Sequence, residues 1–229
     1  MNELLYKIGR RLEWMTWKYI APALASRQIR DYLERPGMKA LNLGCGKNLL
    51  PGWLNCDSLP VPGAVYLDGS RPLPFPANAF DYIFAEHMIE HLPLPSIASL
   101  LTDCRRVLKP GGTIRLVTPN LDAFIDMAQR PDSEESRRYA EWFRKRLPDN
   151  LPAGPVRAMN AIFREHGHQF VMNESYLSRL LSNAGFADAR KCQVGESAIP
   201  ALRGIERHGG VIGEEINRIE SLVMEADKP

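Results

Sequence analysis

The residues best suited to chemistry lie between Lys39 and Asp57, in the segment KALNLGCGKNLLPGWLNCD. An apolar run ends at Gly44-Cys45-Gly46, and the carboxylate of Asp57 follows eleven positions after Gly46. This pattern predicts a buried strand, a glycine-rich turn and a second strand that ends in an acid. Such an arrangement cradles a nucleoside-bearing cofactor, because the glycines let the backbone approach the ligand and the carboxylate binds ribose hydroxyls.

The same segment argues against a nicotinamide dinucleotide. The third glycine of the dinucleotide turn is replaced by Asn48, and the acid arrives sooner than the usual spacing of about 20 residues. The short spacing between Gly46 and Asp57 also leaves little room for a helix between the two strands. We predict that this helix is reduced to a turn around 49–50.

The elements that must position these residues alternate between strand and helix patterns. We predict strands at about 38–43, 53–57, 64–67, 81–85, 113–118, 189–194 and 219–226, and helices at 23–34, 95–108 and 174–184. This alternation predicts an α/β fold, a Rossmann-like, mostly parallel seven-stranded sheet with helices on both faces. Ligands bind at the carboxyl ends of such strands, so one crevice should gather Asn42, Asp57, Asp68, Glu86 and Asn120.

The length of 229 residues fits one sizeable core. We expect an N-terminal helical extension over 1–37 and one domain over 38–229, with a helical insertion at about 121–172. The extension has an apolar stripe with Trp14, Trp17 and interleaved basic residues. It could lie on an anionic membrane surface, but packing on the domain as a lid or dimer element is the preferred interpretation.

Bulk properties exclude several classes of function. A net charge of +2 without a basic aromatic stripe gives no support for nucleic-acid binding. Four cysteines without CxxC spacing, and no secretory leader, predict a reduced, cytoplasmic protein. No segment is apolar enough to span a membrane.

Several blocks, in order, resemble the class I S-adenosylmethionine-dependent methyltransferases. The blocks are LNLGCG (41–46), LPFPANAFDYIFAEHMIEHL (73–92), RVLKPGGTIRLVTPN (106–120) and NESYLSRLLSNAGF (173–186). Within that family, the segment GWLNCDS and the closing SLVMEADKP resemble bacterial enzymes associated with cell-surface glycan synthesis.

The resemblance implies S-adenosylmethionine as the cofactor and S-adenosylhomocysteine as the product. It places Gly44–Gly46 at the methionine part, Asp57 at the ribose, Asp68 near the adenine and Glu86 near the transferred methyl. The full set of residues expected at the cofactor is Asn42, Gly44, Cys45, Gly46, Asp57, Ser58, Asp68, Gly69, Glu86 and His87. Asn42 departs from the family pattern, which has an acid at this position.

Methyl transfer needs a general base when the acceptor is a hydroxyl or a protonated amine. His87, at the end of the fourth strand, is the candidate base, and the alternative is a structural histidine. The sequence HMIEH also matches a zinc-hydrolase pattern through His87, Glu90 and His91. We expect no metal there, because the pattern falls where the methyltransferase block already has Glu-His-Leu.

The acceptor is less well defined by the sequence. We expect a small-molecule or glycan-like acceptor, methylated at oxygen, with His166, His168, Arg203 and Arg207 as candidate contacts. The last two, with Glu206, lie in a long glycine-rich loop at 195–210 that is typical of a lid or substrate loop. A non-catalytic module that only binds the cofactor remains an alternative, favoured by Asn42 and the shortened first helix.

Overall fold

The computed structural model describes residues 17, 21–146, 152 and 154–229. The first 20 residues of the predicted N-terminal helical extension lie outside this part of the chain, apart from Trp17. A helix occupies 21–33, close to the predicted 23–34. Among the described helices, none combines the length and apolar character that crossing a bilayer requires.

Seven strands form one sheet in the order β3-β2-β1-β4-β5-β7-β6. The central strands pair in parallel, whereas β7 is antiparallel to both β5 and β6. The strands are β1 Ala40–Leu43, β2 Leu54–Asp57, β3 Val65–Tyr66, β4 Phe80–Glu86, β5 Leu108–Pro119, β6 Ala187–Cys192 and β7 Ser221–Asp227. The predicted Rossmann-like, mostly parallel, seven-stranded sheet is confirmed.

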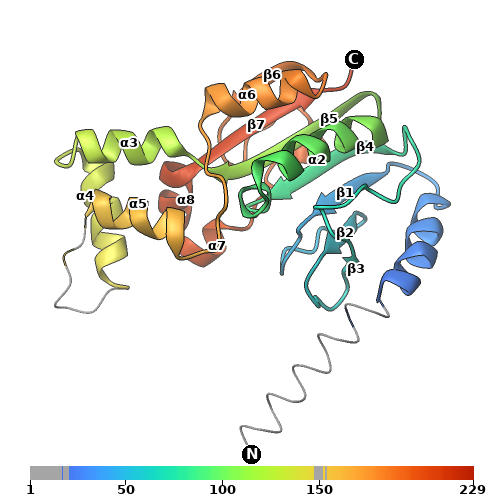
Figure 1. Cartoon of the computed structure of the whole chain (residues 1–229), viewed down its shortest axis with the longest axis horizontal. Coiled ribbons are helices and arrows are strands. Elements are labelled where there is room, and N and C mark those ends of the chain that lie inside the picture. The colour runs from blue at the N-terminus through green and yellow to red at the C-terminus, as the bar shows by residue number, and fades with distance from the viewer. Residues whose placement is uncertain (1–16, 18–20, 147–151, 153) are drawn as a thin grey trace, which may run out of the picture.

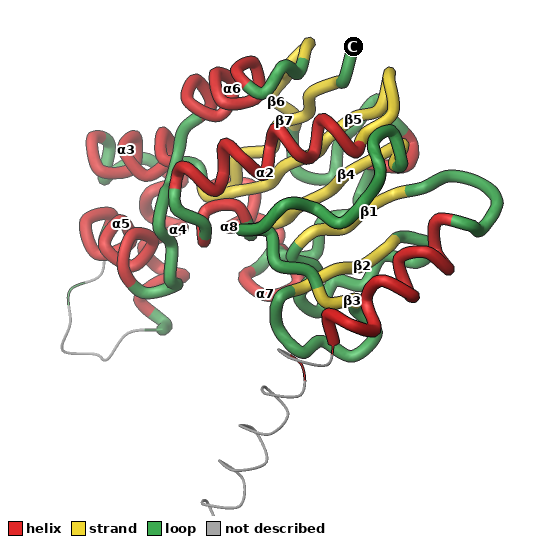
Figure 2. Tube along the Cα trace, turned by 45° about the vertical axis from the view of Figure 1, so that its right-hand side comes forward, coloured by secondary structure: helices red, strands yellow, loops and turns green. Residues whose placement is uncertain are grey.

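One face of the sheet carries the main apolar core. Alternate residues of the strands, such as Leu41, Ile83 and Leu116, pack against α2 (Leu94–Val107), α6 (Glu174–Asn183) and the helix over 21–33. Figures 1 and 2 both show α2 and α6 running across the sheet on the same side. The period-two alternation of buried residues fixes the register, because a slip of one residue would turn this core to the other face.

The other face packs against the segment after β6. Phe84, Val117 and Val223 contact Leu202 and Ile205 there, and the helical cover in this cluster is the short η2 (Pro200–Leu202). The long loop predicted at 195–210 therefore buries its inward-facing apolar residues against this face of the sheet.

A separate helical group lies beyond the end of β5 (Figure 1). It consists of α3 (Leu121–Gln129), α4 (Glu134–Arg144) and α5 (Pro155–Arg164), which share an apolar cluster with Ile216 of α8. The sequence predicted a helical stretch here but missed α7 (Gly209–Ile212) and α8 (Glu214–Glu220), and it began the last strand two residues early. The boundaries at 37 and at 121–172 stay predictions.

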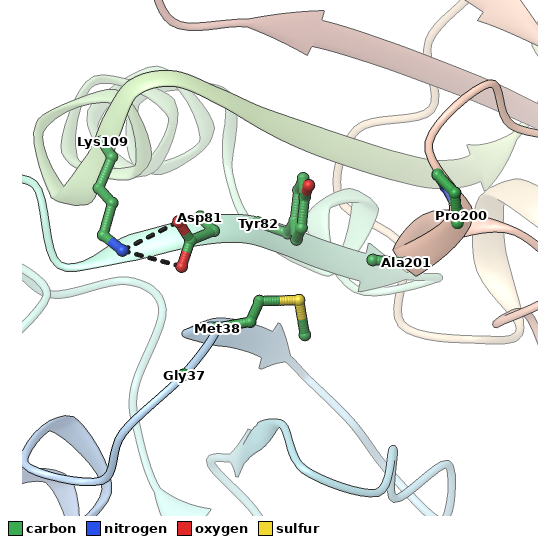
Figure 3. A pocket seen from close by; sticks show the side chains of 7 residues that line it. All are labelled: Gly37, Met38, Asp81, Tyr82, Lys109, Pro200 and Ala201. Atoms are coloured by element: carbon green, nitrogen blue, oxygen red, sulfur yellow. Dashed lines mark hydrogen bonds and ion pairs between the residues drawn. The ribbon is translucent and has the colours of Figure 1, made fainter.

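A surface hollow lies at the amino ends of β1 and β4, away from the strand ends where ligands bind in such sheets (Figure 3). Its polar wall is the ion pair between Lys109 and Asp81, with Nζ at 2.9 Å from both carboxylate oxygens. Oδ2 of Asp81 also accepts the backbone N–H of Lys39 at 2.8 Å. Asp81 is thus occupied in holding two strand starts together.

Candidate active site

The glycine turn after β1 depends on left-handed backbone at two positions. Gly44 has φ +62° and Gly46 has φ +48°. A Cβ on Gly44 would lie 2.2 Å from Cγ of Met88, whereas a Cβ on Gly46 would meet nothing within 4 Å. The turn is therefore packed beneath Met88 at its first glycine and open at its second, where a ligand can approach the backbone.

We expect Gly44→Ala to lower the free energy of unfolding by about 2–4 kcal/mol, from left-handed strain together with overpacking against Met88. Gly46→Ala is the matched control, because its added methyl group carries only the backbone strain, about 1–2 kcal/mol. Urea unfolding of both variants measures the difference. Equal losses would show that Met88 moves aside at no cost.

Asp57 ends β2 beside this turn, with its carboxylate held by two backbone amides. Oδ2 accepts the N–H of Gly46 and Oδ1 accepts the N–H of Leu59, both at 2.8 Å. Each oxygen keeps a second lone pair, and the residue is 8% exposed. The carboxylate is thus fixed in orientation next to the open part of the turn.

Asn42 and Asn48 brace the turn from within. Asn42 is 1% exposed, and its Nδ2 donates to the Asn48 carbonyl and to Oδ1 of Asn55. Nδ2 of Asn48 donates to Oε2 of Glu86 and to the carbonyl of Ile205. No helix forms between β1 and β2, so the predicted reduction of the first helix to a turn is confirmed.

Glu86, at the end of β4, anchors the segment 205–208. Its carboxylate accepts the backbone N–H groups of Arg207 and His208, each at 3.0 Å, besides the amide of Asn48. This interaction joins β4, the glycine turn and the long connection after β6 at one point. The sequence could not predict the contact with the segment 205–208, because its donors, the N–H groups of Arg207 and His208, belong to the backbone.

His87 follows Glu86 with φ +47°, a left-handed conformation that is strained for a residue with a side chain. Its Nδ1 lies 3.2 Å from Oε1 of Glu90, which is fully buried, and its Nε2 lies 3.2 Å from Oγ of Ser221. Burial disfavours the charged ring, but the contact with Glu90 and the charges of Glu220 and Glu86 outweigh it and raise the pKa of His87. The ring is thus oriented by a carboxylate on one side, as a general base must be.

Sequence reasoning missed several residues around His87. The His208 ring stacks on the His87 ring with centroids 3.9 Å apart, and its Nε2 lies 3.2 Å from Oε1 of Glu220. The hydroxyl of Tyr139 donates to Oε2 of Glu220 at 2.7 Å. These residues come from α4, α8 and the start of α7, so only the tertiary fold brings them together.

Most of the remaining candidate residues make contacts with their own neighbours. Asp68 binds its neighbours Ser70 and Arg71, and the ring of Trp17 donates to the carbonyl of Ser58 while packing edge-on against Tyr66. A Cβ added to Gly69 would lie 3.8 Å from Cε of Met88, so side-chain contact there is ordinary. Arg203 and Arg207 are exposed and donate to nearby backbone carbonyls.

Two sequence hypotheses change in the structure. The zinc-hydrolase pattern needs His87 and His91 on one helical face, but only Ile89–His91 is helical, as the 3-10 turn η1. Glu206, suggested as an acceptor contact, is buried and pairs with Arg115.

Burial and the nearby charge of Asp57 raise the pKa of the Cys45 thiol to about 12, as expected for an unreactive cysteine.

Comparison with models of known protein families shows which family this chain belongs to. Residues 16–190 match the model of a family described as a methyltransferase domain. The chain belongs to this methyltransferase family. The predicted class I S-adenosylmethionine-dependent methyltransferase is thereby confirmed, with S-adenosylmethionine as its cofactor. The narrower resemblance to enzymes of glycan synthesis stays a prediction.

Individual relatives of this methyltransferase are distant. An uncharacterized 37.1 kDa protein in transposon TN4556 of Streptomyces fradiae is 29% identical over 46% of this chain and only 36% of its own length. A SAM dependent methyltransferase from Archaeoglobus fulgidus is 18% identical, covers 91% of this chain and 94% of that one, and has a TM-score of 0.49. A possible histamine N-methyltransferase from Thermotoga maritima is 15% identical, covers 98% and 96%, and has a TM-score of 0.48.

Proposed function

We propose that this methyltransferase methylates a hydroxyl group of a small-molecule or glycan-like acceptor, with His87 as the general base. The observation that carries the proposal is the contact between His87 and the fully buried Glu90 at the end of β4. A base oriented by a buried carboxylate suits an acceptor that must lose a proton. We also propose a cytoplasmic location, which the four free cysteines support.

The residues at the end of β1 and β2 fit the cofactor. The carboxylate of Asp57, fixed by two amides, would accept hydrogen bonds from the ribose hydroxyls, and the open backbone at Gly46 would let the methionine part approach. Asn42 supports the turn from beneath and would not touch the ligand. Glu86 would act by holding the segment 205–208 over this end of the sheet.

When bound, S-adenosylmethionine supplies an electrophilic methyl group on a positively charged sulfur, which is already a good leaving group. The protein therefore has to orient the acceptor, exclude water and remove one proton. The Nε2 of His87 faces away from Glu90 and lies 3.2 Å from Oγ of Ser221, and it would take the proton of an acceptor hydroxyl that replaces this contact. Glu90 would hold the ring in place and stabilise the imidazolium that results.

We expect His87→Gln to lower kcat by about 10²–10⁴-fold while cofactor affinity changes little, since the base acts on the acceptor. The wild-type rate should rise with pH, because only the unprotonated ring accepts a proton. The midpoint should lie above the ordinary value of about 6.5, since the pKa of His87 is raised. Glu90→Gln removes the main stabilising charge, so its midpoint should shift to lower pH.

Formation of S-adenosylhomocysteine against a panel of hydroxyl and amine acceptors tests the proposal. We expect turnover with a hydroxyl acceptor and its loss in His87→Gln. Tight cofactor binding without turnover on any acceptor would favour the non-catalytic module instead. Turnover that is unchanged in His87→Gln would exclude the proposed base.

A further inference from the structure

Three of the five histidines of the chain meet on one side of the η1 turn. The rings of His91 and His168 lie edge to face with centroids 4.8 Å apart, and His166 lies 5.6 Å from His168. The sequence offered only the pair His166-Gly167-His168 and no third ligand. The fold supplies His91, because the backbone N–H groups of Gln169 and Phe170 both donate to the Glu90 carbonyl.

The cluster also contains the carboxylate of Glu90. One ligand atom from each of Glu90, His91 and His168 lies within 4.8 Å of the other two. Glu90 is fully buried, and beyond its charge contact with His87 its Oε1 receives no hydrogen bond within the described residues. Glu90 therefore offers a carboxylate oxygen close to the rings of His91 and His168.

His168 is already oriented as a ligand would be. Its Nδ1 lies 2.6 Å from the carbonyl of Ile162, so this nitrogen carries the proton and donates it. The lone pair of the neutral ring is then on Nε2. A backbone carbonyl that fixes the tautomer of a histidine in this way is the usual outer partner of a metal ligand.

We propose that His91, His168 and Glu90, with His166 as a fourth donor, bind one zinc-like transition-metal ion that clasps the loop 165–170 to η1. Imidazole with a carboxylate suits zinc, nickel or cobalt, whereas magnesium and calcium prefer oxygen ligands. Ligand atoms around tetrahedral zinc lie about 3.3 Å apart, given metal–nitrogen distances of about 2.0–2.1 Å. The ligand atoms of Glu90, His91 and His168, within 4.8 Å of one another, would move inward to this spacing, and the exposed His166 would join them.

A second group, His87, His208 and Glu220, also lies within 4.8 Å. Its two rings stack 3.9 Å apart with a tilt of 36°, so their in-plane lone pairs do not converge on one point. The rings of His91 and His168 are inclined by 67°, and their lone pairs can converge. The geometry therefore favours the first group.

Competition between the chelator-stripped full chain and a chromogenic chelator for Zn²⁺ tests the site, with Co²⁺ absorption as a second readout. We expect one ion per chain, and affinity at least about 10-fold weaker in His91→Gln, His166→Gln and His168→Gln, since even the loss of an outer partner costs that much. His208→Gln is the matched control and should bind zinc as the wild type does. Circular dichroism checks that each variant is folded.

Absence of stoichiometric zinc binding would overturn the proposal. Binding that survives in all three test variants would do the same, and loss confined to His208→Gln would assign the ion to the second group. The measurement does not depend on the proposed function, because zinc and S-adenosylmethionine are titrated separately.

Discussion

Asp57→Ala should weaken binding of S-adenosylmethionine by at least about 100-fold. The change would remove the two hydrogen bonds that we propose between the ribose and this charged carboxylate, each worth about 1.5–3 kcal/mol. It also frees the backbone amides of Gly46 and Leu59, which now hold the turn and the start of the next loop. Isothermal titration calorimetry on the purified variant measures the loss.

Two further variants separate charge from structure in this result. Asp57→Asn keeps an oxygen acceptor for one backbone amide but removes the charge, and it should show an intermediate loss. Asp132→Ala removes an exposed carboxylate from the connection between α3 and α4 and should bind as the wild type does. Unchanged affinity in Asp57→Ala would show that the ribose does not bind at the end of β2.

Arg115→Met should lower the free energy of unfolding by about 3–5 kcal/mol, the usual cost of leaving buried charges without a partner. Arg115 is fully buried, and its guanidinium donates to Oε1 of Glu206 and Oε1 of Glu225, each at 2.7 Å. Its Nη2 also donates to the carbonyl of Gln193. Removing the arginine leaves Glu206 buried without this partner, while Glu225 keeps only its contact with the partly exposed Arg190.

The Arg115→Met substitution should also disturb the active site. Glu206 is followed directly by Arg207 and His208, whose backbone N–H groups donate to the carboxylate of Glu86. We therefore expect weaker cofactor binding in Arg115→Met as well. Arg138→Met breaks exposed pairs with Glu134 and Glu215 and should change stability by at most about 1 kcal/mol. Adding Glu206→Gln and Glu225→Gln to Arg115→Met should recover part of the loss. A loss below 1 kcal/mol in Arg115→Met alone would contradict the anchoring role.

The sequence predicted the sheet well because its strands are local patterns. Leu41 and Leu43, or Ile83 and Ala85, alternate with residues of the opposite face, and this periodicity is visible without a structure. The glycine turn and the acid at Asp57 were predictable for the same reason. The short α7 and α8 were missed, because their residues form a helix only where Ile216 can pack on α3 to α5.

The surroundings of His87 and His91 could not be predicted, because they depend on contacts between distant segments. Ser221 and His208 approach His87 only when β7 inserts beside β5 and the segment 205–208 closes on Glu86. The H-x-x-E-H pattern suggested one helical face, but the left-handed backbone at His87 turns the two histidines to different neighbours. A spacing rule cannot foresee such a change in backbone direction.

Calorimetric titration of the full chain with S-adenosylmethionine, and with NAD in the same buffer, tests the identity of the cofactor site most directly. We expect one S-adenosylmethionine bound per chain with a micromolar Kd, similar binding of S-adenosylhomocysteine, and no heat from NAD. Saturable binding of NAD, or absence of S-adenosylmethionine binding by the folded chain, would contradict the assignment of the site formed by Gly44, Gly46 and Asp57.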